Sequence, residues 1–138
     1  MVVAAEDPDV LRTLGELTRV RRAMRLRAGP AGADQRSPDG LKAIRGFAEA
    51  IAVDPALLID LAQPTTAPPL AMVADAHAAG LTVQAWTVPD AGAVFPPPPF
   101  RPGDARRIFA ALFTAGCDAV AGDNALLIAR GRDDVTLR

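Results

Sequence analysis

Apolar and polar residues alternate along the chain in segments that predict strands followed by helices. Short apolar runs at 2–5, 50–53, 81–88 and 117–122 are rich in small and β-branched residues, as expected of buried strands. Between them, apolar residues recur every three or four positions, as on one face of a helix. A strand over 20–26 is also predicted, although its three arginines make it the weakest of the set.

Signals that start and end helices support this alternation. Asp7 with Pro8, and Ser37 with Pro38, each precede an apolar stripe, which is the order of an N-cap followed by a first-turn proline. Gly80 closes the apolar helix that precedes the strand at 81–88. Strands and helices in strict alternation with short connections predict an α/β fold of about five βα units, with parallel strands and crossover helices.

Acidic residues stand just past the predicted strands. Because parallel strands end at one rim, where α/β proteins bind ligands, these carboxylates allow a metal-binding rim. The commoner role of an acidic residue after a strand is to cap the next helix, and we favour that interpretation for Asp7, Asp54 and Asp123. The remaining members of the set are Glu6 and Asp90.

Composition narrows the class of protein. The 138 residues carry a net charge of −1 and are 50% hydrophobic, which predicts one globular domain and gives no electrostatic basis for nucleic-acid binding. No apolar run reaches the length of a membrane span, and no signal peptide is visible, so a cytoplasmic location is the default expectation. The single cysteine, Cys117, excludes an internal disulfide and is expected to be a buried small residue.

The last sixty residues resemble the glycerophosphodiester phosphodiesterase family. GLTVQAWTVPD (80–90) is similar to the family's strand pattern V-h-x-W-T-V, and AGCDAVAGDNALLI (115–128) is similar to its G-V-D-G and T-D-x-P motifs. Upstream, AIAVDPALLI (50–59) and VVAAEDPDVLRTLGEL (2–17) are similar to two further family segments, more weakly. The resemblance runs from about the fourth to the eighth strand of the family's barrel, so residues 1–138 are expected to form a single partial barrel domain.

This resemblance implies a partial TIM (β/α)8 barrel and phosphoric diester hydrolysis in lipid and glycerol metabolism, with calcium or magnesium in the complete family site. The family's catalytic groups are an early His-Arg-Gly, a glutamate–aspartate pair, a histidine-aspartate and a glutamate on the third strand. None of them occurs here, since the only histidine, His77, lies in a predicted helix. The chain is therefore expected to be a family fragment that lacks the catalytic N-terminal half and is inactive alone, with no catalytic or metal-binding residue of its own.

Trp86 is the one residue to which the resemblance gives a site role. The matching family tryptophan walls the substrate pocket, so Trp86 is expected to bind substrate through its flat apolar face. The alternative is that Trp86 fills the gap between the barrel and its helices. The proline-rich segment 91–103 follows Trp86 and is long enough to predict a lid-like loop over a site.

Three functional hypotheses follow. In the first, the chain takes a glycerophosphodiester substrate only when an N-terminal half completes it. In the second, it is a non-catalytic half-barrel that self-associates or binds a partner, because five strands cut from a closed barrel leave two open edges. The third is a new enzyme that uses the acidic rim, but no histidine or reactive lysine accompanies the rim to support catalysis.

Overall fold

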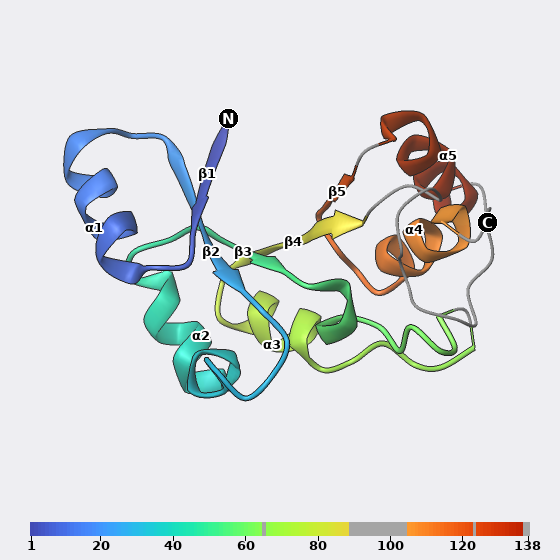
Figure 1. Ribbon diagram of the computed structural model, residues 1–138, viewed down its shortest axis with the longest axis horizontal. Coiled ribbons are helices and arrows are strands. Elements are labelled where there is room, and N and C mark those ends of the chain that lie inside the picture. Colours follow the sequence, from blue (N-terminus) through green and yellow to red (C-terminus); the bar gives the residue numbers. More distant parts are fainter. Residues whose placement is uncertain (65, 89–104, 123, 137–138) are drawn as a thin grey trace.

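The computed structural model describes residues 1–64, 66–88, 105–122 and 124–136 of the chain (Figure 1). Strands and helices alternate within these ranges, as predicted. The strands are β1 (Val2–Ala5), β2 (Arg21–Leu26), β3 (Ala50–Val53), β4 (Thr82–Val88) and β5 (Ala119–Gly122). The helices are α1 (Pro8–Leu17), α2 (Pro38–Arg45), α3 (Met72–Ala78), α4 (Ala105–Thr114) and α5 (Ala125–Thr136), with short 3-10 turns η1 (Asp34–Arg36) and η2 (Pro55–Leu57).

The five strands form one parallel sheet in the order β1-β2-β3-β4-β5. The sheet curls, with α1 to α3 along one stretch of it and α4 and α5 beyond β4 and β5 (Figure 1). This arrangement is an α/β half-barrel of the TIM type, so the predicted fold class is confirmed. Because parallel strands end at the same rim, the segments that follow β2 and β3 lie beside the end of β4 at the carboxyl edge of the sheet.

The two faces of the sheet differ in side-chain size. Residues that alternate along the strands point to opposite faces, and one set joins the helices in the main core. The largest side chains of that core are fully buried, among them Phe109, Leu112, Ile51 and Met24. The other set forms a separate small cluster of Ala23, Ala50 and Ala52, with Ala4 and Trp86 packed against it. We call this second face the concave face.

Strand β2 is complete despite its arginines. Met24 and Leu26 are buried in the main core, and the side chain of Arg22, which lies on the same face, is neutralised by Glu49. Glu49 accepts hydrogen bonds from Arg22 Nη2 at 2.5 Å and from the Arg22 backbone N–H at 2.7 Å. The guanidinium lies where a side chain on Gly15 of α1 would have to be, so the glycine makes room for it.

Helix caps decide the roles of several acidic residues. Asp7 caps α1 by accepting from the Asp9 N–H at 2.8 Å, as predicted. Asp54 accepts from the Ala56 N–H at 3.0 Å and opens the 3-10 turn η2, where a short helix was expected. Asn124 accepts from the Leu127 N–H at 3.1 Å at the start of α5. Asp90, Asp123 and the predicted loop over 91–103 lie outside the described residues.

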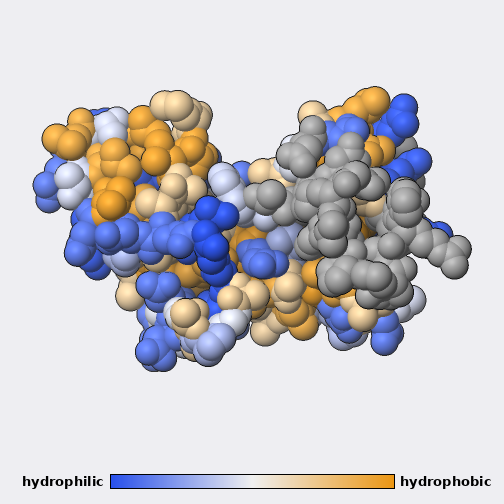
Figure 2. Space-filling view, in the orientation of Figure 1, coloured by the Kyte–Doolittle hydropathy of each residue, from blue (hydrophilic) through white to orange (hydrophobic). Residues whose placement is uncertain are grey.

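Exposed apolar side chains gather at the ends of the half-barrel. Figure 2 shows apolar surface over α1 and the beginning of the chain, and the exposed large side chains there are those of Met1, Val2, Val10 and Leu17. At the other end, Leu126 of α5 is 61% exposed. Within the described ranges, no helix has the length and apolar character needed to cross a membrane.

Candidate functional site

A cavity of about 340 Å³ opens at the carboxyl edge of the sheet. It lies between the ends of β2, β3 and β4, which is the edge at which barrels of this type carry their sites. Its volume is near the lower end for small-molecule pockets, so it suits a ligand the size of a phosphate ester or glycerol rather than a large cofactor. The cavity is lined by Arg25, Leu26, Arg27, Ala28, Ala52, Asp54 and Trp86.

Trp86 lies in this cavity and not between the sheet and the helices. It follows Ala85, which points into the main core, so the alternation of β4 turns the indole to the concave face. There it packs against the alanine cluster and remains half-buried. The expected pocket-lining position is therefore observed, whereas substrate binding by Trp86 stays a prediction.

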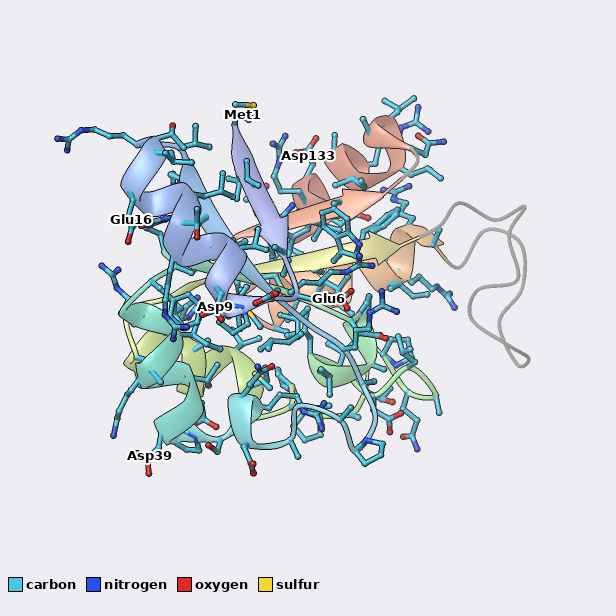
Figure 3. The ribbon with its side chains drawn as sticks, turned by 60° about the vertical axis from the view of Figure 1, so that its left-hand side comes forward. Met1, Glu6, Asp9, Glu16, Asp39 and Asp133 are labelled. Atoms are coloured by element: carbon cyan, nitrogen blue, oxygen red, sulfur yellow. The ribbon has the colours of Figure 1, made fainter. Side chains whose placement is uncertain are left out.

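Arg25 covers the ring of Trp86. Its guanidinium carbon lies 5.0 Å from the centroid of the indole, within the range of a cation–π contact. Glu6, at the point where β1 ends (Figure 3), reaches the same region. Its Oε1 lies 2.6 Å from Arg27 Nη2 but 3.5 Å from Arg25 Nη1. Glu6 is therefore paired mainly with Arg27, and Arg25 is held chiefly by the ring.

The acidic rim does not form a metal centre within the described residues. The carboxylates of Asp7 and Asp54 accept hydrogen bonds from backbone N–H groups, and Glu6 pairs with arginines. Among the residues that the structure describes, no group of three or more His, Cys, Asp and Glu side chains comes together. The capping interpretation thus holds for both aspartates, and these carboxylates lack the geometry to hold a hard divalent cation.

His77 lies at the opposite edge of the sheet from the cavity. Its Nε2 is 2.9 Å from Oδ2 of Asp118, which immediately precedes β5. The same carboxylate oxygen accepts from the Val83 N–H at 2.7 Å. The pair therefore ties α3 to the amino ends of β4 and β5. His77 thus lies in a helix, as predicted, and it has no geometry for acid–base work in the pocket.

Cys117 is also outside the cavity lining, and its thiol is unreactive. The side chain is buried at the amino end of β5. Burial, with a smaller contribution from the charge of Asp118, raises the pKa of the thiol to about 12. Because the thiolate is the nucleophilic form, the thiol is unreactive near neutral pH, in agreement with the expected role as a buried small residue.

Sequence reasoning missed Arg25. The arginines of β2 counted only as evidence against a strand, whereas the register of the sheet gives them separate roles. Arg25 pairs with Ala52 of β3, and Ala52 pairs with Gln84 of β4. Trp86 is two residues beyond Gln84 on the same face. The alternation of Arg21, Ala23 and Arg25 was the signal that could have placed a guanidinium beside the tryptophan.

The fold resembles that of solved structures, although no family model matches the sequence. No family model and no curated protein matches the chain. A protein from Silicibacter pomeroyi, described as a glycerophosphoryl diester phosphodiesterase, shares the fold with a TM-score of 0.65 and 16% identity over 98% of this chain. A protein from Agrobacterium tumefaciens with the same description shares it with a TM-score of 0.63 and 16% identity, again over 98% of the chain.

The chain covers only part of these neighbours. It spans 38% of the Silicibacter protein and 44% of the Agrobacterium protein. At this identity the likeness establishes the fold, namely part of the barrel seen in glycerophosphoryl diester phosphodiesterases.

Proposed function

We propose that this chain forms the second half of a glycerophosphodiester phosphodiesterase barrel and hydrolyses nothing on its own. The observation that carries the proposal is the fold likeness over 98% of the chain to two proteins described as such enzymes, of which it spans 38% and 44%. Hydrolysis of a phosphodiester by this class needs carboxylates around a divalent cation and groups that transfer protons. Since the described residues hold no such cluster, calcium or magnesium would bind to the other half.

The role of this chain is then to build one wall of the substrate pocket. The face of Trp86 offers an apolar surface to the glycerol or alcohol part of the substrate, and the cavity is large enough for either. The small alanines beneath the indole hold it at the carboxyl edge of the sheet. The chain would thus contribute binding and orientation, which lower the barrier only when the hydrolytic groups are present.

The ends of the half-barrel support completion by further βα units. In the described sheet, β1 and β5 each pair on one side only, which leaves two edges open. Val10 and Leu17 on α1, and Leu126 on α5, are exposed, and neighbouring units of a closed barrel could cover them. Covering these side chains would remove apolar surface from water and so favour assembly.

The same open edges favour a second candidate, a non-catalytic half-barrel that pairs with another copy. Two half-barrels placed edge to edge would satisfy unpaired strand backbones and cover α1. Light scattering separates the candidates, because this one requires a discrete dimer of the purified chain. A well-folded monomer would rule the second candidate out.

The first test is the coding DNA immediately upstream of the Met1 codon. We expect an in-frame segment that encodes a His-Arg-Gly, a glutamate–aspartate pair and a histidine-aspartate. A stop codon or unrelated sequence there would remove the basis for a split or longer enzyme. The polypeptide encoded upstream can then be combined with this chain in an activity assay.

In that assay, only the combined halves should hydrolyse glycerophosphocholine in calcium or magnesium, and EDTA should abolish the activity. Trp86→Ala should raise KM in the combined enzyme. The matched control is Phe47→Ala, because Phe47 also lies under an arginine, Arg12 at 4.7 Å from its centroid, but outside the cavity. Metal-dependent hydrolysis by the purified chain alone would overturn the proposal.

A further inference from the structure

The guanidinium of Arg25 is held against the ring of Trp86, and it still has N–H donors that could bind a ligand. It lines the cavity, its side chain is 33% exposed, and its nearest carboxylate oxygen is 3.5 Å away on Glu6. That distance is beyond the range of a charge-assisted hydrogen bond. Among the described residues, no hydrogen bond of the Arg25 side chain is found. Apart from Nη1, which faces Glu6 in this long ion pair, the N–H donors of the planar group are available to a ligand in the cavity, as far as the described residues show.

A purely structural arginine on the same strand looks different. Arg22 donates to Glu49 at 2.5 Å, and its own backbone N–H binds the other oxygen of that carboxylate. It is also less exposed, at 21% of its side chain. Arg25 has only the long ion pair with Glu6, and the surface beneath it consists of Trp86 and alanines. Its packing on Trp86 fixes the direction of the guanidinium without using its donors.

The other charges around the cavity are already engaged. Oε1 of Glu6 accepts from Arg27 Nε at 2.7 Å and lies 2.6 Å from Nη2 of the same guanidinium. Asp54 Oδ1 accepts from the Ala56 N–H at 3.0 Å. Arg25 is thus the charged group of the cavity lining that lacks a close partner within the described residues. Arg25 is therefore the group of the cavity that can bind an anion, and it does so near the Asp54 carboxylate, which keeps its charge.

We propose that this cavity is an oxyanion subsite, in which Arg25 binds a phosphate or carboxylate group and Trp86 packs against the carbon chain that carries it. The inference rests on the proposed function and gives its substrate class. Glycerophosphodiesters would present either the phosphodiester itself or a second anionic group of the alcohol to Arg25. Quaternary ammonium head groups are disfavoured, because one face of the indole already holds a cation and a second cation would be repelled.

The chain provides its own reporter for this site. Trp86 is the only tryptophan and the chain has no tyrosine, so its fluorescence reports the cavity alone. We expect inorganic phosphate and glycerol 3-phosphate to change the emission saturably, whereas choline chloride at equal ionic strength should not. Arg25→Ala should weaken binding by about tenfold or more, and Arg25→Lys by less, because a charge remains but the fork is lost.

Two further variants make the assignment specific. Arg12→Ala removes the comparable guanidinium over Phe47, far from the cavity lining, and should bind phosphate as the parent does. Glu6→Gln should bind it a few-fold more tightly, because the competing carboxylate is gone. Circular dichroism verifies that each variant is folded, and if Arg25→Ala does not fold, Arg25→Lys and Glu6→Gln still decide the question.

Comparing the affinities of two diesters shows which anionic group of the substrate Arg25 binds. Equal affinity for glycerophosphoserine and glycerophosphocholine would assign Arg25 to the phosphodiester, and at least tenfold preference for the serine ester would assign it to the second anionic group. Choline binding as tight as phosphate, or phosphate binding that survives Arg25→Ala unchanged, would overturn the subsite.

These readings are independent of the hydrolysis assay. Phosphate binding without hydrolysis by the combined halves would refute the proposed function and leave the subsite standing. Hydrolysis by the combined halves without Arg25-dependent phosphate binding would support the proposed function and refute the subsite.

Discussion

Two arginines of β2, three residues apart, show how differently the two faces of the sheet use charge. Arg22 points to the helices, where Glu49 binds it and Gly15 gives it space. Arg25 points to the concave face, where it lies on Trp86 with its nearest carboxylate 3.5 Å away. Arg22 is built into the fold, although its buried Nε has no partner among the described residues, whereas Arg25 lines the cavity. The comparison suggests that stability resides on the helix face and ligand chemistry on the concave face.

The apolar residues follow the same division. The helix face buries large side chains completely, including Phe109 and Leu112 of α4. The concave face is built from alanines under a half-buried Trp86. Large buried side chains contribute most of the favourable free energy of folding, whereas small ones leave space for a ligand. The faces can therefore be separated by experiment.

The largest expected contrast is between the two aromatic truncations Phe109→Ala and Trp86→Ala. Phe109→Ala should lower the free energy of unfolding by about 3–5 kcal/mol, because it leaves a cavity in the main core. Trp86→Ala should lower it by only about 1–2 kcal/mol, because the indole is partly exposed and contacts small side chains. Urea unfolding followed by circular dichroism measures both.

Leu112→Ala is a second test of the same core, and it should also cost about 2–5 kcal/mol because Leu112 is fully buried. If Trp86→Ala proved as destabilising as these two variants, the concave face would be part of the folding core, and the division between the faces would fail.

A smaller contrast concerns the carboxylates that pair with the two arginines. Glu49→Gln should cost about 1–2 kcal/mol at neutral pH, because it weakens charge-assisted hydrogen bonds to Arg22. Glu6→Gln should cost at most about 0.5 kcal/mol, since Glu6 is 48% exposed.

The stabilisation that Glu49 provides should depend on pH. The hydrogen bond from Arg22 holds the pKa of Glu49 below its usual value. Its stabilisation is therefore complete above the ordinary glutamate pKa and is lost as the pH falls through the folded-state value. The difference between parent and Glu49→Gln should shrink on acidification from pH 6 toward pH 3. A difference that stays constant over that range would show that the Glu49 charge contributes nothing.

The smallest expected effect is at the amino edge. His77→Ala should cost about 0.5–1 kcal/mol, because it removes one exposed hydrogen bond to Asp118 while the Val83 N–H keeps its acceptor. The variant should bind phosphate in the cavity as the parent does, since His77 lies at the other edge of the sheet. Altered phosphate binding would connect the two edges and contradict their independence.

Local sequence signals predicted most of the fold because they act over few residues. Asp7 before Pro8 marks the start of α1, and the alternation over 82–88 marks β4, without reference to the rest of the chain. The apolar turn after Asp54 was harder, since a 3-10 turn and a short helix share the same start. The strand at 21–26 was undervalued because the ion pair between Arg22 and Glu49 forms only in the folded sheet.

The site could be predicted only in part. The pocket position of Trp86 was expected from the family resemblance and not from local periodicity, and the indole does line the cavity. The guanidinium above it comes from a strand far away in the sequence, and only the register through Ala52 brings the two together. Pairing across parallel strands depends on the whole sheet and leaves no trace in local periodicity. For that reason Arg25 and its relation to Glu6 escaped the sequence analysis.

The order of strands in the sheet has a consequence for biosynthesis. Because each strand pairs with the one that precedes it in the chain, every βα unit that leaves the ribosome meets a partner that has already emerged. Growth of the sheet can then proceed from the N-terminus in the direction of translation, without waiting for a distant segment. In a barrel completed by an N-terminal half, the open edges of β1 and β5 would both pair with strands made earlier, so the last strand to emerge would close the barrel.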